Sequence, residues 1–200
     1  VIDWYAATGR RVSVQDLNGN VLDVPMDVRI TRLHTPGIPL RERLWERPDM
    51  YVIAPEEYKK LFPQNVYTNG DDPLTWPRVD VVLERKNWTA DGHALPLAGM
   101  AKWDVGAYMI EVSAKDAGGK EVKVQKVVSI YDPAVQHTGF VNEAFHVEAV
   151  KAKVEPGEKA QLLLSSALPE AHILMEVERE GQIAVRRWFT LKDGQQLVEL

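Results

Sequence analysis

The chain has 200 residues and a mass of 22.6 kDa, which is enough for one large domain or two small ones. Hydrophobic residues make up 45% and charged residues 26% of it, values that are usual for folded domains and argue against disorder. There are 17 basic and 19 acidic residues up to Asp132, and 7 basic and 10 acidic residues after it. Neither half is basic, so nucleic acid and anionic lipid are poor candidate partners.

Cysteine and long apolar runs are both missing from the sequence. Without Cys there is no disulfide, no thiolate metal site and no Cys nucleophile. The longest apolar runs, such as residues 162–164, are far shorter than the ~18 residues of a membrane-spanning helix, so we expect no transmembrane segment. Val1 stands where an initiator Met would, and no basic start with an apolar stretch follows it, so we expect a piece of a longer or processed protein.

The beginning of the chain alternates apolar and polar residues, as antiparallel strands do. Residues 11–17 alternate and end at Asn18-Gly19, a pair that suits a tight hairpin because both residues tolerate a positive φ. A second run covers residues 21–33 and contains Pro25. Because Pro has no N–H to donate to a neighbouring strand, this run is predicted to be an edge strand or two short strands divided at Pro25.

The alternation disappears between residues 36 and 77, a stretch that holds seven of the chain's 12 Pro. It is too long for an ordinary connection, so we predict an insertion with its own structure. Four of the six Trp lie between residues 45 and 103, namely Trp45, Trp76, Trp88 and Trp103. Core packing of these rings is favoured over a carbohydrate-stacking platform, because an insertion must be attached to its domain by buried area.

A helix is predicted within the insertion, over residues 54–62, as the only substantial helix of the chain. Pro55 suits the first helical position, acids precede lysines in the order that the helix dipole favours, and a second Pro ends the segment. Tyr58, Leu61 and Phe62 share one face of this helix. We expect that face to attach the helix to the strands.

Strand patterns resume after the insertion and continue to the end of the chain. They cover residues 79–85, 106–114, 121–131, 145–154, 160–165, 172–179, 182–191 and 195–200, with Gly-containing turns between many of them. The alternation is interrupted at residues 132–142, which are predicted to be the boundary between two domains.

The sequence therefore predicts an all-β chain of two immunoglobulin-like antiparallel β-sandwiches in tandem. The first covers residues 1–132 with the insertion at about 36–77, and the second covers residues 143–200. An immunoglobulin-like sandwich needs ~100 residues for seven strands, so we expect the second one to be truncated.

Motifs for nucleophilic catalysis and for metal binding are missing. No Gly-x-Ser-x-Gly elbow is present, and the Ser residues lie inside or at the ends of strand patterns. Residues 16–20 imitate the start of a calcium loop, but Val21 stands where that loop needs Gly. The His are dispersed without the spacing of a metal site, so core or solvated imidazoles are favoured over metal ligands; they are His34, His93, His137, His146 and His172.

Acidic pairs are the remaining candidates for catalytic residues, but their positions are better explained by solvent exposure than by catalysis. Adjacent acids usually point apart, whereas glycoside hydrolysis needs two carboxyl groups converging across a cleft. The pairs are Glu56-Glu57, Asp71-Asp72, and Glu176 with Glu178 on one strand face. We therefore predict no catalytic, cofactor-binding or metal-binding residue, and a protein that is not an enzyme.

Several segments resemble the macroglobulin-type domains of bacterial alpha-2-macroglobulin family proteins. They are residues 14–20 (VQDLNGN), 105–112 (VGAYMIEV), 115–119 (KDAGG), 154–160 (VEPGEKA) and 173–181 (ILMEVEREG), the last followed by Trp188 and Leu191. The insertion, with Glu56-Glu57-Tyr58, Leu61-Phe62-Pro63 and Tyr67, is similar to one in bacterial members with an elaborated middle domain. The resemblance covers nearly the whole chain.

The resemblance implies a non-catalytic scaffold segment from the middle of a longer peptidase-trapping protein. Such a protein is exported to the periplasm or cell envelope, and we expect a lipid anchor outside this segment. Its partners would be the neighbouring domains and, through the intact protein, endopeptidases. The family's thioester joins a Cys to a Gln, so it cannot lie in a chain without Cys.

Two other functions remain open from the sequence. One is a surface β-sandwich module that recognises a glycan or a peptide through the Pro- and Trp-rich insertion. The other is an accessory domain of a polysaccharide-degrading enzyme, because β-sandwiches serve all three purposes and the fold alone does not separate them.

Overall fold

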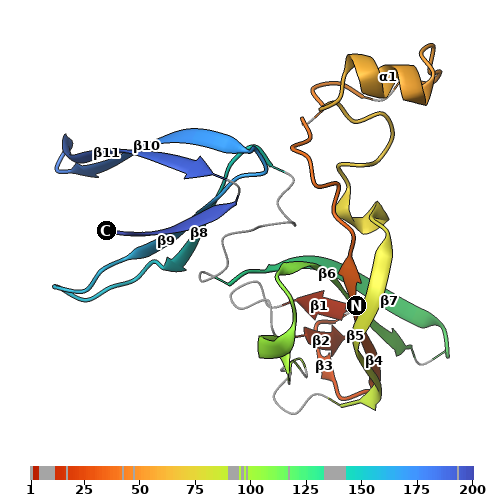
Figure 1. The fold of residues 1–200 in the computed structure, drawn as a ribbon. Coiled ribbons are helices and arrows are strands. Elements are labelled where there is room, and N and C mark those ends of the chain that lie inside the picture. Colours follow the sequence, from red (N-terminus) through yellow and green to blue (C-terminus); the bar gives the residue numbers. More distant parts are fainter. Residues whose placement is uncertain are drawn as a thin grey trace. The chain divides into compact units, whose positions relative to one another are not determined.

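The computed structural model describes residues 2–4, 12–16, 18–41, 43–46, 48–89, 95, 97, 99–116, 118–132, 143–192 and 194–200 (Figure 1). These residues form two compact units. The first consists of Val1–His34 and Pro77–Ile130, and the second of Thr35–Trp76 and Tyr131–Leu200. Most of the described secondary structure is antiparallel β-strand, with one short α-helix, so the all-β prediction is confirmed. No helix in these ranges is long and apolar enough to cross a membrane.

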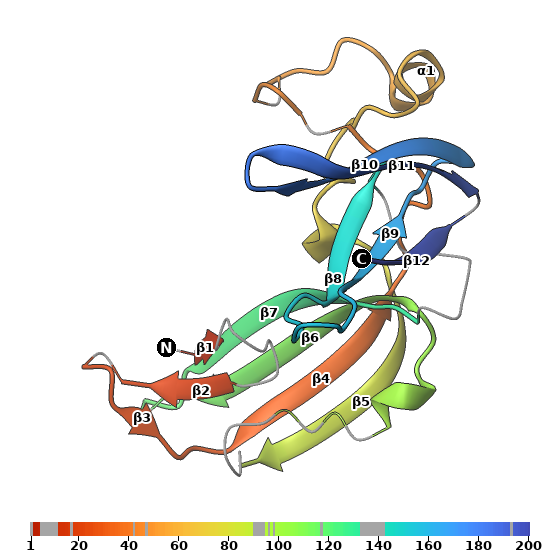
Figure 2. The same ribbon diagram turned by 90° about the vertical axis from the view of Figure 1, so that its left-hand side faces the viewer.

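The first unit contains two antiparallel sheets. The smaller has the order β1-β2-β3, from β1 (Ile2–Trp4), β2 (Val12–Gln15) and β3 (Val21–Leu22). The larger has the order β5-β4-β6-β7, from β4 (Met26–Leu33), β5 (Arg78–Trp88), β6 (Gly106–Lys115) and β7 (Glu121–Ile130), and Figure 2 shows these four strands side by side. A short 3₁₀ helix, η3 (Met100–Lys102), lies between β5 and β6.

Pro25 divides the second predicted strand run, as the sequence indicates. It lies between β3 and β4 and outside both strands. Because the break leaves β4 free of Pro, β4 pairs on both sides, with β5 and with β6. The run is therefore two strands, the second of which is interior to its sheet.

The two sheets of the first unit share one apolar core. Every second residue of a strand points to the same face, so β2 contributes Val12 and Val14 while β4 contributes Val28 and Ile30. β6 adds Tyr108, Ile110 and Val112 to the same cluster. Trp88 and Trp103 pack against its edge, in agreement with the core role predicted for them.

Two turns of this unit are built in the same way, each around an Asp. Asp16 Oδ1 accepts hydrogen bonds from the backbone N–H of Asn18 and Asn20, at 2.8 and 2.9 Å. Asp116 Oδ1 accepts from Gly118 and Lys120, both at 2.9 Å. The acidic cluster that imitates a calcium loop is thus an Asp-stabilised hairpin turn.

Gly119 has a φ of 80° in the second of these turns, so its replacement by Ala is expected to destabilise the first unit. A Cβ there would meet no atom within 4 Å, so the cost is the backbone conformation alone, about 1–2 kcal/mol. Gly106→Ala in β6 is the control, because Gly106 has an ordinary φ and its Cβ would lie 3.5 Å from Arg32 Nε. Urea unfolding measures both; equal losses in the two variants would contradict the prediction.

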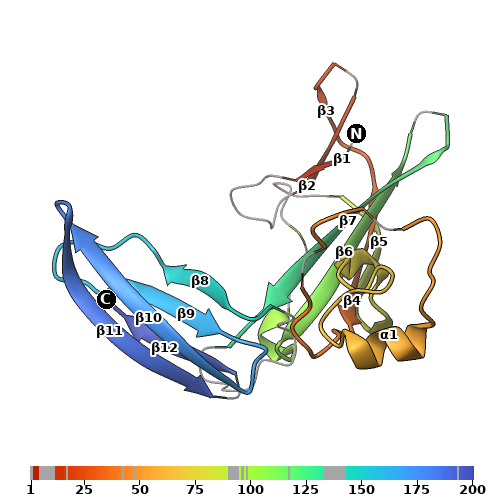
Figure 3. The same ribbon diagram turned by 90° about the horizontal axis from the view of Figure 1, so that it is seen from above.

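The second unit contains a three-stranded sheet and a two-stranded ribbon (Figure 3). The sheet has the order β12-β9-β8, from β8 (His146–Lys151), β9 (Gln161–Ser165) and β12 (Gln195–Glu199). The ribbon pairs β10 (Glu170–Arg179) with β11 (Gln182–Lys192). Leu164, Leu191 and Val198 form a small core that joins sheet and ribbon. The predicted boundary at residues 132–142 lies outside the described residues except for Asp132.

The insertion belongs to the second unit and carries the predicted helix, α1 (Pro55–Leu61), followed by the 3₁₀ helix η1 (Pro73–Thr75). Pro55 occupies the first turn with Glu56 and Glu57, and both lysines lie in the last turn, so the prediction of the helix is confirmed. The predicted attachment through its apolar face is wrong. The helix buries no residue: Leu61 is 57% and Phe62 42% exposed.

Tyr58 has aromatic partners inside the insertion. Its ring lies 5.1 Å from the rings of both Phe62 and Tyr67, measured between centroids. Trp76 is buried, and its Nε1–H donates to the carbonyl of Gly70 at 2.9 Å, as expected for a ring that fixes a loop. The helix therefore packs on the insertion's own aromatic residues.

Candidate functional site

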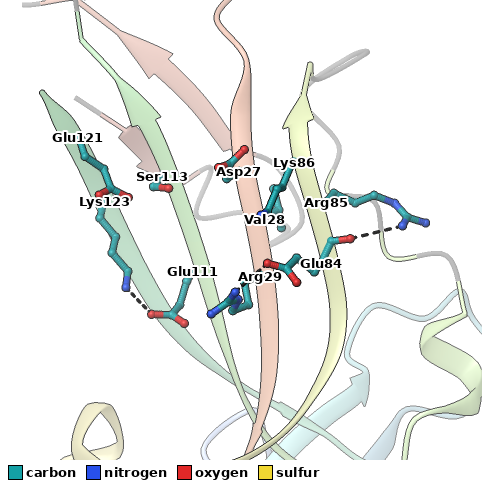
Figure 4. A pocket seen from close by; sticks show the side chains of 10 residues that line it. All are labelled: Asp27, Val28, Arg29, Glu84, Arg85, Lys86, Glu111, Ser113, Glu121 and Lys123. Atoms are coloured by element: carbon teal, nitrogen blue, oxygen red, sulfur yellow. Dashed lines mark hydrogen bonds and ion pairs between the residues drawn. The ribbon is translucent and has the colours of Figure 1, made fainter. Parts of the chain in front are cut away.

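A hollow of about 310 Å³ with mostly charged lining residues lies on the large sheet of the first unit, and we call it the charged hollow (Figure 4). It lies on the face opposite the core, because the residues that alternate with Val28 and Ile30 point away from the apolar cluster. It is lined by Asp27, Val28, Arg29, Glu84, Arg85, Lys86, Glu111, Ser113, Glu121 and Lys123.

Strand register places a row of polar residues across all four strands of this face. Arg29 of β4 stands opposite Glu84 of β5 on one side and Glu111 of β6 on the other. Glu111 in turn stands opposite Gln125 of β7. Directly opposed residues in a sheet have side chains close enough to interact, so the row reads acid, base, acid and amide from β5 to β7.

Each carboxylate in this row has a basic partner. Arg29 Nη2 donates to Glu84 Oε1 at 2.7 Å, and both side chains are about half exposed. Glu111 is only 8% exposed. Its Oε1 accepts hydrogen bonds from Gln125 Nε2 at 2.8 Å and from Arg78 Nη2 at 3.2 Å, and it forms an ion pair with Lys123 Nζ at 2.5 Å. Glu111 is therefore the centre of a polar cluster supplied by three strands.

The pKa values of these acids are shifted in the direction that favours the charged form. A hydrogen bond from Arg29, together with its charge, lowers the pKa of Glu84. Burial raises the pKa of Glu111, but the hydrogen bonds from Lys123 and Gln125 and the charge of Arg78 outweigh it, so the net pKa is lowered. A general acid needs the opposite shift, toward neutral pH. The arrangement of the hollow is that of an ion-pair network.

The acidic pairs considered from the sequence are used separately. Glu56 and Glu57 lie in the first turn of α1, and Asp72 Oδ1 accepts from the backbone N–H of Leu74 to begin η1. Glu176 pairs with Arg186 across the β10–β11 ribbon. The structure brings none of these described acids together across a cleft.

Two of the described His, His146 and His172, lie near acids, whereas His34 is exposed and its backbone N–H donates to the carbonyl of Pro77. His146 is next to Glu143 and Glu148, and His172 is next to Glu170. Across the described ranges, no three His, Asp or Glu gather closely enough to hold a metal ion. His93 and His137 lie outside those ranges.

Glu111 is the residue that sequence reasoning did not single out. It is the only charged residue in a run of otherwise apolar residues at 105–112. A lone carboxylate in a strand buried on both faces must find partners, because burying an unpaired charge is costly. That pattern is a signal for a polar cluster, although it does not identify the partners.

A second unusual surface is the loop of residues 43–53 in the insertion, of which residue 47 is not described; we call it the Trp45 loop. Its base is fixed: the Arg43 guanidinium donates to the carbonyls of Val66 and Tyr67, and the Tyr67 hydroxyl donates to the carbonyl of Ile53 at 2.9 Å. Four of its side chains are the most exposed large apolar ones of the described chain: Leu44, Trp45, Met50 and Val52, with Trp45 71% exposed. The prediction of core packing is wrong for Trp45.

An apolar cleft of about 630 Å³ opens at the end of the first unit where the two Asp-stabilised turns lie. Apolar side chains from β2, β6 and β7 and from the segment around β3 line it, and Lys115, Asp116 and Asp16 lie among them. It holds no convergent set of catalytic groups, so its described lining offers a surface and not a reaction centre.

The described surfaces therefore comprise an ion-pair network, an anchored apolar loop and an apolar cleft. None of them combines a nucleophile, a base or a metal-ligand set in the described residues. No known family model, no curated protein and no solved structure matches this chain.

Proposed function

We propose that this chain is a non-catalytic scaffold segment of an exported, envelope-associated peptidase-trapping protein of the alpha-2-macroglobulin type. The observation that carries the proposal is the succession of two units, each made of antiparallel sheets around its own apolar core. The resemblance of residues 105–112 and 154–160 to macroglobulin-type domains adds to it. In this role the chain holds neighbouring domains in place, and endopeptidases meet the intact protein.

The charged hollow is better explained by a scaffold function than by catalysis. Its central carboxylate, Glu111, is held charged by Lys123, Gln125 and Arg78, which all contact its Oε1, so it has no proton to give at neutral pH. A network of this kind fixes the register of strands and suits a sheet face that must remain polar.

The Trp45 loop supports contact with another domain or protein. Large apolar side chains on an anchored loop are a typical docking feature, since Trp and Met buried at the centre of an interface contribute much of its free energy. Leu44, Trp45 and Met50 have that exposure, and the hydrogen bonds at the base of the loop reduce the entropy lost on docking.

The intact protein, expressed from its whole coding region and incubated with a panel of endopeptidases, is expected to protect a large protein substrate from them in stoichiometric amounts. The 200-residue chain alone is expected to show neither inhibition nor turnover of ester, peptide or glycoside substrates. Failure of the intact protein to trap any peptidase would overturn the proposal, and so would turnover by the repurified 200-residue chain.

A surface-binding module is the second candidate, favoured by the exposure of Trp45 in the insertion. In that case Trp45→Ala would abolish binding of a peptide or glycan to the isolated chain. Under the scaffold proposal the same change would instead weaken the contact between this segment and its neighbours in the intact protein. An accessory domain of a polysaccharide-degrading enzyme would be identified by a catalytic domain in the same polypeptide.

A further inference from the structure

The outward face of the β10–β11 ribbon has a regular pattern that the scaffold function does not use. Ala171, Ile173 and Met175 of β10 pack on the small core of the second unit, so the residues between them point to the other side. Four cross-strand pairs form this outward face, which we call the ribbon face: Glu170 with Lys192, His172 with Thr190, Leu174 with Trp188, and Glu176 with Arg186.

Trp188 lies in the middle of the ribbon face and is 69% exposed. Its opposite residue, Leu174, is exposed as well, so together they form one apolar step on a regular strand pair. The ring sits on a paired backbone and not on a loop tip, so the step is flat and fixed in place. An exposed indole in such a position offers a large planar surface at little cost in conformational entropy.

Polar pairs border this apolar step on both sides. Arg186 Nε and Nη2 both lie 2.7 Å from Glu176 Oε1, which holds one pair together. Thr190 Oγ1 lies 3.3 Å from His172 Nδ1 on the other side, and Lys192 Nζ lies 3.7 Å from Glu170 Oε2 beyond it. Hydrogen-bonding groups thus lie one strand repeat, about 6.8 Å, on either side of the indole along β11.

From this juxtaposition we propose that the ribbon face binds an uncharged carbohydrate, with one sugar ring stacked on Trp188. The two acids and the two bases of the face cancel in charge, so it has no attraction for an ionic ligand. A sugar ring has an apolar C–H face for the indole, and its hydroxyl groups can bond to Glu176, Arg186 and Thr190 at the two sides.

A second protein sheet is a poorer occupant of the same face. Packing it against the indole would bury the Glu176–Arg186 pair, and the desolvation of a buried ion pair offsets its attraction. Interface centres are depleted of charged residues for this reason. A carbohydrate leaves the Glu176–Arg186 pair hydrogen-bonded and in contact with water. It can therefore stack on the Trp188 ring without the free-energy cost of desolvating that pair.

A comparison with Trp45 shows what distinguishes the ribbon face. Trp45 is 71% exposed, but its exposed neighbours among the described residues of the Trp45 loop are Leu44, Met50 and Val52, and no ion pair is found between those described residues. The two rings therefore have equal exposure and different surroundings. Of these two exposed rings in the described part of the chain, Trp188 is the one with paired polar groups on both sides, the combination that suits a sugar.

The test is affinity electrophoresis of the 200-residue chain in gels with soluble neutral polysaccharides, namely a β-glucan, a xylan and a galactomannan, and with anionic alginate as a charge control. At least one neutral polymer is expected to retard the chain and to change its Trp fluorescence. Trp188→Ala is expected to weaken that binding at least tenfold and Trp188→Tyr to retain most of it. Val79→Ala, which removes an exposed apolar side chain of β5 that belongs to neither Trp surface, is the control and is expected to bind as the unchanged chain does.

The ring is exposed, so Trp188→Ala is expected to leave the thermal unfolding midpoint and the elution volume unchanged. Retardation by alginate alone, no retardation by any neutral polymer, or equal binding by Trp188→Ala would overturn the proposal. A change of oligomeric state in Trp188→Ala would also overturn it, because the face would then be a protein contact. None of these outcomes bears on peptidase trapping by the intact protein, so the two proposals fail separately.

Discussion

Replacement of Tyr108 by Ala is expected to destabilise the first unit by about 3–5 kcal/mol, the range for removal of a buried aromatic side chain. Tyr108 is 1% exposed and lies in the core cluster between the two sheets. Its ring stacks on Trp103, with 5.5 Å between centroids, so the loss leaves a cavity and an unsupported indole. Urea unfolding followed by Trp fluorescence and far-ultraviolet circular dichroism measures the change.

Tyr108→Phe is the matched control for that variant. The Tyr108 hydroxyl donates to the carbonyl of Asp104 at 2.7 Å, so Phe loses one hydrogen bond and keeps the ring. The expected cost is about 1 kcal/mol. If Phe and Ala were equally destabilising, the hydrogen bond and not core packing would hold this strand, and the assignment of Tyr108 to the core would be wrong.

Local patterns along the chain were sufficient to predict most strands and the helix. Strand patterns located β6 and β7 to within about a residue: β6 is a short, mostly apolar run that is buried on both faces, and β7 alternates between a half-buried and an exposed face. Pro25 marked the division between β3 and β4, and Pro55 with Glu56 and Glu57 marked the start of α1. All of these features depend on residues that are close together in the chain, so they can be predicted from one sequence alone.

Contacts between distant residues were not predictable in the same way. Trp45 and Trp76 lie in the same Pro-rich insertion, yet one is exposed and the other is buried with its Nε1–H on the carbonyl of Gly70. The helix face around Leu61 shows the same limit: periodicity predicts which residues share a face, and only tertiary structure decides whether anything covers it.

The candidate sites depend on register, which the sequence does not contain. Arg29 meets Glu84 and Glu111 because β4 pairs with both β5 and β6, an order that alternation alone leaves open. The Leu174–Trp188 step forms because β10 and β11 pair across a Gly turn, although a bulge next to Val177 shifts the register near that turn. Spacing along the chain thus indicated hairpins, while the surfaces they create came from the paired strands.

Glu111→Gln is expected to destabilise the first unit at pH 7 by about 1.5–3 kcal/mol, the range for hydrogen bonds to a charged group. The Glu111 carboxylate interacts with Lys123, Gln125 and Arg78. A Gln side chain at position 111 has no negative charge to offer these three groups. The side chains of Arg78 and Lys123 are about half exposed, so water can solvate their charges in the variant. The loss of folding free energy is therefore expected to be smaller than for a fully buried ion pair.

The pH dependence of this difference distinguishes charge from shape. The pKa of Glu111 is lowered in the folded state, so the acid stabilises the fold above its unfolded value of 4.5 and loses that contribution as the pH falls through the folded value. Urea unfolding between pH 7 and pH 3 is therefore expected to show the unchanged chain and Glu111→Gln converging in acid. Glu84→Gln, which alters an exposed pair with Arg29, is the control and is expected to show a much smaller difference at every pH. A gap between the unchanged chain and Glu111→Gln that is constant with pH would mean that Glu111 acts through its shape, and the ion-pair network would not be what holds this face of the sheet together.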